Sequence, residues 1–208
     1  FVADNYIKSV DNTGLPIKDL AGDFAKIADG IVSLTPETMR KQRIYYDPYP
    51  QFSDPGRTQN WRIENALGAR NAVVAQLSSG AGLVTYNGHS HHWQWAITDE
   101  SPNADPNWLL GLYDTDVLTN KDRYFISLSM TCLTSQFHKP AFSGTVLDER
   151  MLLNPAGGAV SVWGPAGLSV AYGHDLLQRG FYEALLAAPP LTAKVGALIE
   201  AGNVALLT

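Results

Sequence analysis

The chain has 208 residues, which is long enough for one α/β domain with a substantial core. Apolar residues make up 45% and charged residues 17%, which excludes a disordered chain. The formal net charge of -5, without a cluster of Lys or Arg, argues against a nucleic-acid partner. No apolar run approaches the roughly 18 residues that a membrane-spanning helix needs.

The first part of the chain alternates short β-prone runs with helical periodicity. Over residues 17–34 the apolar side chains recur on one helical face, and the same holds for residues 61–77. The expected elements are a strand end over 1–3, a polar, turn-rich segment over 6–16, a helix over 17–34, a short strand over 43–46, a loop over 49–58 and a helix over 61–77.

The second part repeats the alternation with longer strands. The expected elements are a strand over 82–87, a polar and aromatic loop over 91–108, a helical turn over 116–118, a strand over 123–131, a loop over 135–144, a helix over 147–153, a strand over 158–163, a loop over 164–170, and helices over 173–188 and 192–207 that Pro189-Pro190 separates. Strands that alternate with helices predict an α/β fold, in which helices cover both faces of a mostly parallel sheet.

Two strands of this predicted sheet end at residues whose side chains can take part in catalysis. The run over 82–87 stops at Gly88, and His89 follows it directly. The run over 123–131 ends at Cys132, the single cysteine of the chain. Side chains at the carboxyl edge of a parallel sheet lie where ligands bind. A thiol beside an imidazole is the pair that nucleophilic cysteine catalysis needs.

Both residues also have simpler interpretations. A lone cysteine near a strand end is compatible with a small buried apolar side chain, and a lone histidine with an ordinary surface or core residue. The order His89-x-His91-His92 resembles half of a zinc-binding pattern. The Asp and His that the zinc hydrolases need next are replaced here by Trp93 and Gln94, so no metal ligand is assigned.

The order and spacing of several short motifs resemble the gingipain-type cysteine peptidase family, which has a caspase-like three-layer fold. The residues that carry the resemblance are Phe1 to Asp4, Gly22-Asp23-Phe24, Tyr86-Asn87-Gly88-His89-Ser90 with Trp93, Ser129-Met130-Thr131-Cys132 with Phe137, Leu147-Asp148-Glu149, Leu152-Leu153 and Gly157-Gly158-Ala159-Val160. They extend over nearly the whole chain. The resemblance implies that residues 1–208 are a single peptidase catalytic subdomain, a fragment that lacks flanking N- and C-terminal parts.

The resemblance also implies roles for individual residues. Cys132 is expected to be the nucleophile and His89 the general acid, with Asp4 as the acidic residue that orients the histidine. The backbone N–H groups of Ser90 and Cys132 are expected to form the oxyanion hole. The family has Gly where this chain has Ser90, which places a side chain close to the substrate carbonyl.

Substrate-binding residues are expected at Asp23, Trp93 and Trp163. In the basic-specific relatives an acidic residue at the start of the first helix contacts the P1 side chain, and Asp23 falls near that place. A carboxylate in the first turn of a helix is also favoured by the helix dipole alone. The tryptophans are equally compatible with pocket walls and with packing.

The sequence is therefore interpreted as a cysteine endopeptidase that acts on peptides or proteins without a cofactor. Two alternatives stay open: a catalytically silent relative that serves as a binding module, and a metal-dependent hydrolase that uses His89, His91 and His92. The remainder of the same polypeptide is expected as a partner, and the resemblance implies a secreted or cell-surface location.

Overall fold

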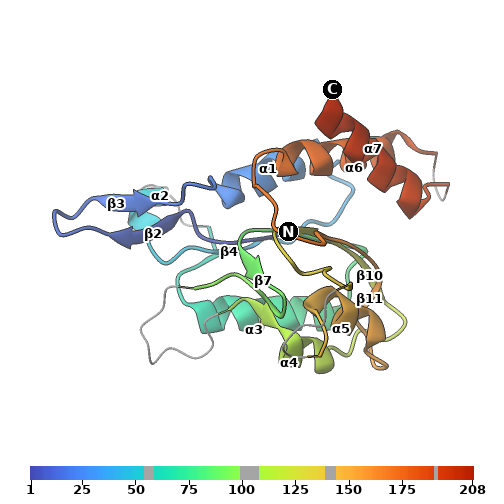
Figure 1. The fold of residues 1–208 in the computed structure, drawn as a ribbon, viewed down its shortest axis with the longest axis horizontal. Helices are drawn as coiled ribbons and strands as arrows, with labels where there is room; N and C mark the ends of the chain where they lie inside the picture. Colours follow the sequence, from blue (N-terminus) through green and yellow to red (C-terminus); the bar gives the residue numbers. More distant parts are fainter. Residues whose placement is uncertain (54–58, 99–107, 139–143, 190–191) are drawn as a thin grey trace.

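A parallel sheet forms the centre of the computed structural model, which describes residues 1–53, 59–98, 108–138, 144–189 and 192–208 (Figure 1). Its strands are β1 (Val2–Ala3), β4 (Ile44–Tyr46), β5 (Arg62–Ile63), β6 (Leu83–Asn87), β10 (Phe125–Met130) and β11 (Ala159–Trp163). They lie in the order β11-β10-β6-β1-β4-β5, and all neighbours are parallel.

The chain winds outward from the middle of this sheet in both directions. From β1 it proceeds to β4 and β5 on one side, and from β6 to β10 and β11 on the other. The order therefore reverses between β1 and β6. In open α/β sheets, the crevice beyond the carboxyl ends of the strands at such a switch point is the usual ligand site.

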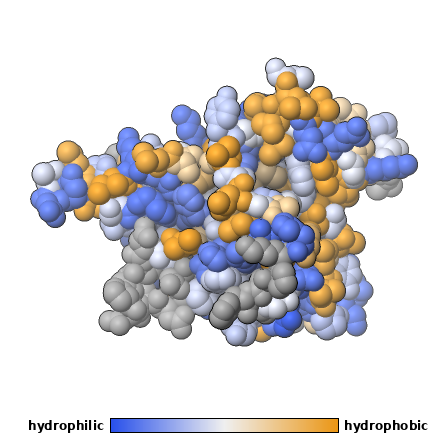
Figure 2. All heavy atoms as spheres, in the orientation of Figure 1, coloured by the Kyte–Doolittle hydropathy of each residue, from blue (hydrophilic) through white to orange (hydrophobic). Residues whose placement is uncertain are grey.

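Helices cover both faces, which confirms the predicted α/β class with three layers. One face carries α1 (Phe24–Leu34), α6 (His174–Ala187) and α7 (Val195–Leu207), and the other carries α3 (Ala66–Ser79), α4 (Leu112–Asp116) and α5 (Leu147–Leu153) (Figure 1). The short helix α2 (Pro50–Ser53) follows β4. Helix α7 leaves Val204, Leu206 and Leu207 exposed, and apolar side chains gather at this end of the molecule in Figure 2.

Two small antiparallel sheets stand beside the central one. The hairpin of β2 (Ile7–Val10) and β3 (Pro16–Lys18) projects from the carboxyl edge of the central sheet (Figure 1). Its turn is closed by the carboxylate of Asp11, which accepts hydrogen bonds from the N–H groups of Thr13 (2.8 Å) and Leu15 (2.9 Å). A second sheet joins β7 (Ser90–His91), β8 (Gln94–Trp95) and β9 (Leu110–Gly111).

Apolar packing on each face of the sheet holds the layers together. Between the sheet and α3, the inward side chains recur at helical spacing and are at most 2% exposed: Ala66, Ala69, Val73 and Leu77. On the opposite face, Leu128 and Met130 of β10 pack with Phe181 of α6. Burial of such side chains stabilises the fold by about 1.5–3 kcal/mol for each large residue.

Most predicted elements are confirmed, with shifts at their ends, and four predictions are wrong. The helix predicted over 17–34 begins only at Phe24, because Pro16–Lys18 pairs with Ile7–Val10 across the segment that was expected to be polar and irregular. The helix predicted over 61–77 begins at Ala66, because Arg62–Ile63 joins the sheet edge as β5.

The third wrong prediction is the loop over 91–108, whose described part contains β7 and β8. The fourth is the loop over 49–58, whose described part contains α2, because a proline at the first position of a helix is well tolerated. Parts of three predicted loops (54–58, 99–107 and 139–143) and Pro190 of the predicted helix break lie outside the described residues. Within the described ranges, no helix is both long and apolar enough to cross a membrane.

Candidate active site

His89 stands directly beyond the carboxyl end of β6. Glycine is required at position 88, just before it, because the backbone passes close to its neighbours there. A Cβ at this position would collide with the Tyr86 hydroxyl and with the side chain of Asp4. The ring of Phe24 meets the His89 ring edge-on, with 5.3 Å between the centroids. The side chain of His89 is 37% exposed and therefore remains accessible to a substrate.

A carboxylate from the hairpin holds the His89 ring. Asp19 follows β3, and its Oδ2 lies 2.6 Å from His89 Nε2. Burial disfavours the ionised form of Asp19, but hydrogen bonds from His89 and from the N–H of Ala21 outweigh burial and lower the Asp19 pKa below its ordinary value of 3.8. The hydrogen bond to Asp19 in turn raises the His89 pKa above 6.5. The pair is thus an imidazolium and a carboxylate over a widened pH range.

Asp4, the residue expected to orient the histidine, contacts its backbone instead. Its Oδ2 accepts a hydrogen bond from the N–H of His89 (3.2 Å), and its Oδ1 accepts one from the N–H of Asn5 (2.9 Å). The register explains this placement. Ala3 lies opposite Asn87, so Asp4 and Gly88, which follow them, also lie side by side. Asp4 is 0% exposed, and burial raises its pKa. Asp19 therefore takes the ring contact that was expected of Asp4.

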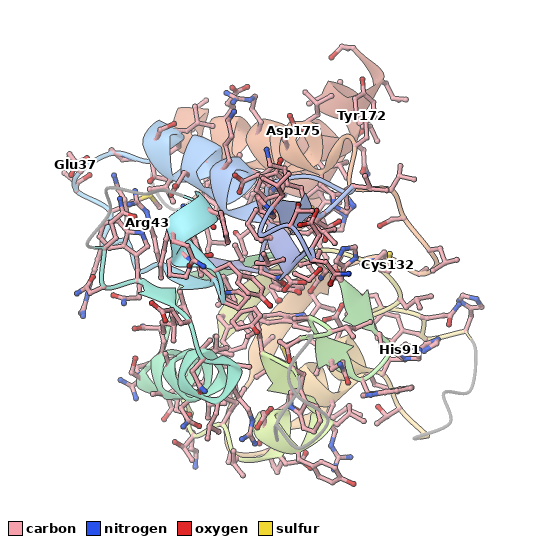
Figure 3. All side chains as sticks on the ribbon, turned by 90° about the vertical axis from the view of Figure 1, so that its left-hand side faces the viewer. Glu37, Arg43, His91, Cys132, Tyr172 and Asp175 are labelled. Carbon is pink, nitrogen blue, oxygen red and sulfur yellow. The ribbon has the colours of Figure 1, made fainter. Side chains whose placement is uncertain are left out.

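Cys132 emerges from the neighbouring strand at the same level. Met130 of β10 lies opposite Asn87 of β6, and Cys132 and His89 each stand two residues further along. This confirms that the two residues lie at the carboxyl ends of adjacent parallel strands. Figure 3 looks onto this edge of the molecule and shows Cys132 there, with His91 at the same edge.

Ser90 joins the two strand ends. Its hydroxyl accepts a hydrogen bond from the N–H of Cys132 (3.0 Å) and donates one to the Cys132 carbonyl. Ser90 is 8% exposed. In the free protein, the N–H of Cys132 that was expected in the oxyanion hole is therefore occupied by the side chain that replaces the family glycine.

A buried carboxylate fixes the turn that carries Cys132. Asp148, in the first turn of α5, accepts hydrogen bonds from the hydroxyls of Ser129 and Ser135, which flank Cys132. Asp148 is 0% exposed, and burial raises its pKa. A Cβ at Gly164, just after β11, would collide with Asp148. The turn thus has a rigid polar support.

The segment that follows β11 reaches the sulfur of Cys132. The N–H of Ser169 donates to Sγ at 3.4 Å, and the Ser169 hydroxyl lies 3.1 Å from Nε2 of His174. No sequence pattern predicted the contacts of Asp19, Ser169 and His174. A turn signal at Asn12-Thr13-Gly14 could have revealed the hairpin and hence the place of Asp19.

The expected substrate-binding residues have different surroundings. Asp23 is the N-cap of α1, and its Oδ1 accepts a hydrogen bond from the N–H of Lys26 (3.0 Å). Trp93 packs on the ring of His91, with 3.8 Å between centroids. Trp163 stacks on Phe181 of α6 at 5.8 Å and fills the space over Gly202 of α7, so its ring belongs to the packing between β11 and these helices.

The three histidines of the zinc-like pattern do not converge. His89 is engaged with Asp19, whereas Nδ1 of His92 lies 3.1 Å from Nδ1 of His91, and its Nε2 lies 2.6 Å from Oε1 of Gln136. Among the residues that the structure describes, no three His, Cys, Asp or Glu side chains are grouped in a way that could hold a metal ion.

Comparison with known proteins places this site in context. The family model described as Peptidase family C25 matches residues 1–208. Lys-gingipain and Lys-gingipain 381, both from Porphyromonas gingivalis, are each 33% identical over 66 residues, which cover 32% of this chain and 3% of the relative. The chain thus spans only a small part of the length of these curated relatives.

Two solved structures share the fold. The Arg specific cysteine proteinase gingipain R (RGPB) superimposes with a TM-score of 0.63 at 18% identity, over 99% of this chain and 41% of that one. The complex of the Porphyromonas gingivalis RgpB pro- and mature domains gives a TM-score of 0.64 at 16% identity, over 99% of this chain and 42% of that one. At this identity, the likeness establishes the fold.

Proposed function

Because the chain belongs to peptidase family C25, we propose that it is a cysteine endopeptidase in which Cys132 attacks the scissile carbonyl of a peptide or protein. The observation that carries the proposal is the register of β6 and β10, which brings His89 and Cys132 to the same edge of the sheet. That edge adjoins the switch point between β1 and β6, where α/β sheets bind ligands.

The proposed chemistry proceeds in two stages. In the first, Sγ of the Cys132 thiolate forms a bond to the carbonyl carbon, and the tetrahedral intermediate then releases the amine, which takes a proton from His89. The acyl group then remains on Sγ as a thioester. In the second stage, His89 accepts a proton from water, whose oxygen bonds to the carbonyl carbon; the C–S bond breaks, and the carboxylic acid product and the Cys132 thiolate are released. Since Nε2 of His89 faces Asp19, Nδ1 is the ring atom that exchanges these protons.

The oxyanion hole requires a rearrangement. We expect the backbone N–H groups of Ser90 and Cys132 to receive the developing negative charge. The Ser90 hydroxyl must first release the N–H of Cys132, which it binds in the free protein. The same observation favours a second candidate function, a catalytically silent relative that keeps the fold as a binding module.

Substrates with Arg or Lys at P1 are the best candidates. Asp23 lies next to Phe24, whose ring contacts His89, and only its Oδ1 has a described hydrogen bond, to the N–H of Lys26. A carboxylate at that place would bind a cationic side chain through charge-assisted hydrogen bonds. The names of the relatives, Lys-gingipain and the Arg specific gingipain R, point to the same substrate class. We expect Trp93, at the same edge, to line the approach.

The chain is further proposed to be one peptidase subdomain of a longer polypeptide that acts outside the cell or at its surface. The coverage of 41% of the gingipain R chain and the resemblance to gingipain-type peptidases support this organisation. Cell fractionation tests the location.

The decisive experiment combines a thiol-reactive peptide warhead with a fluorogenic peptide panel that carries Arg, Lys, Asn, Asp or Leu at P1. We expect the warhead to label Cys132 and the wild type to cleave the Arg and Lys members of the panel in preference to the others. Cys132→Ala is expected to abolish both while the circular dichroism spectrum stays unchanged. Labelling without cleavage would favour the silent relative, and cleavage that persists in Cys132→Ala but stops with a chelator would favour the metal-dependent hydrolase.

A further inference from the structure

The sulfur of Cys132 is enclosed on one side by the segment that follows β11. The N–H of Ser169 donates to Sγ at 3.4 Å, the thiol donates to the Ser169 carbonyl at 3.4 Å, and the Ser169 hydroxyl lies 3.8 Å from Sγ. The backbone of Ser169 therefore holds the sulfur from both its N–H and its carbonyl, which restricts where Sγ can lie. The same segment is tied to the Cys132 turn, because the N–H of Leu133 donates to the Gly167 carbonyl at 3.0 Å.

The hydroxyl of Ser169 fixes the direction of this N–H. It donates its single hydrogen to the carbonyl of Thr131, the residue before Cys132. Its contact with Nε2 of His174 (3.1 Å) must then be a hydrogen bond that the ring donates. His174 is 8% exposed, and burial lowers its pKa, so the ring is neutral and carries its proton on Nε2.

His174 is itself attached to the strand that delivers His89. It begins α6, and Gln178, one turn later, donates from Nε2 to the His174 carbonyl (2.9 Å) and to Oδ1 of Asn87 (2.7 Å). Asn87 returns a hydrogen bond to Oε1 of Gln178 at 3.1 Å. Since Asn87 ends β6 two residues before His89, hydrogen bonds connect the surroundings of the sulfur with the strand that positions the imidazole.

We propose that Ser169 and His174 are positioning residues for the nucleophile. His174 holds the Ser169 hydroxyl, and the backbone N–H and carbonyl of Ser169 then hold Sγ of Cys132 in one position. Neither residue needs to contact the scissile bond. The inference rests on the proposed role of Cys132 as the nucleophile.

The test measures the reactivity of the thiol directly, without a peptide substrate. The full chain is treated with iodoacetamide, a neutral alkylating agent, and modification of Cys132 is followed by mass spectrometry as a function of pH. Ser169→Ala and His174→Phe are expected to slow alkylation by about fivefold across the pH range, the effect of one hydrogen bond. Ser169→Thr keeps the hydroxyl and His174→Gln keeps an N–H donor, so both are expected to retain most of the rate.

Ser33→Ala is the matched control, because Ser33 is an exposed residue of α1 whose hydroxyl binds only the Gly30 carbonyl in the described structure. Unchanged alkylation in Ser169→Ala and His174→Phe, in a protein that still cleaves peptides, would overturn the positioning roles and leave the peptidase proposal intact. If alkylation is slower in both variants but the wild-type protein cleaves no peptide, the positioning roles are supported and the peptidase proposal is refuted. If His174→Phe fails to fold, Ser169→Ala and Ser169→Thr decide the question.

Discussion

The two sides of the candidate site are held by different kinds of interaction. On one side, the His89 ring is bound by the carboxylate of Asp19, whose pKa is lowered and which carries a full charge. On the other side, the sulfur of Cys132 is bound by the backbone and hydroxyl of Ser169, behind which stands the neutral, buried ring of His174. The first interaction is ionic and the second is neutral, and both are partly buried.

We infer that this difference gives the two sides separate tasks. In the proposed mechanism, the carboxylate beside the ring favours the imidazolium that would donate a proton to the leaving amine. On the other side, hydrogen bonds with the Ser169 backbone hold the sulfur without a charged group. Among the residues that hold the two side chains, the pH dependence should therefore originate from the His89–Asp19 pair.

The largest effect is expected from removal of the charge on the His89 side. Asp19→Asn keeps a hydrogen-bond acceptor but removes the carboxylate, so the imidazolium becomes less stable. We expect kcat to fall on the order of 10²-fold, within the range of general acid catalysis, and the His89 pKa to decrease. Steady-state kinetics across pH measure both. Asp122→Asn, at an exposed position before β10, is the control, and a profile that does not change in Asp19→Asn would contradict the ionic assignment.

A smaller effect is expected from Asp23, which lies four residues after Asp19. Asp23→Asn preserves the helix cap, since Asn and Asp are equally good N-caps, and so isolates the charge. We expect kcat/KM for Arg and Lys substrates to fall about tenfold relative to Leu, the loss of one charge-assisted hydrogen bond at a partly exposed site. A P1 preference that survives the substitution would return Asp23 to the sole role of a helix cap.

Ser90 connects the two sides, and its removal should increase activity. Ser90→Gly frees the N–H of Cys132 for the oxyanion. We expect kcat to rise about fivefold, the gain of one hydrogen bond in the transition state, together with a small decrease in melting temperature. Ser90→Ala separates the hydroxyl from the Cβ: it should give the same gain if the hydroxyl alone is responsible. A fall in kcat in both variants would indicate that the hydroxyl assists the reaction.

The smallest effect concerns stability as a function of pH. The raised His89 pKa contributes stability that is complete below the ordinary value of 6.5 and is lost as the pH rises through the folded value. The lowered Asp19 pKa contributes stability that is present above 3.8 and is lost as the pH falls through the folded value. The decrease in urea midpoint that Asp19→Asn causes should therefore be larger at pH 5.5 than at pH 8.5. An equal decrease at both pH values would contradict this contribution of the pair.

Much of the fold could be predicted because its signals are local. The strands that lead to His89 and Cys132 are continuous apolar runs, as expected for a sheet buried on both faces, and α5 follows its predicted range. Since parallel neighbours share an edge, the adjacency of His89 and Cys132 follows once the two strands pair.

The residues that hold these two side chains were harder to predict, because their contacts join segments far apart in the sequence. Asp19 was hidden in an apparent helical pattern: Ile17 and Leu20 fit one face of a helix with Phe24, but they are 49% and 104% exposed. Ser169 lies in a loop without periodicity, and only the turn of the chain after β11 brings it to the sulfur. Asp4 was predicted to contact the His89 ring but binds the His89 backbone N–H. Its position at a strand end does not distinguish these two contacts.

The projecting hairpin has a consequence for how the protein responds to heat. An isolated two-stranded ribbon is marginally stable, and this one carries the exposed side chains Leu15, Ile17 and Leu20. Such a ribbon opens locally at a lower free energy than the central sheet, so its amides should exchange with solvent sooner than those of β6 and β10. Each opening withdraws Asp19 from His89 while the sheet stays folded. Peptide cleavage should therefore disappear at a lower temperature than the circular dichroism signal.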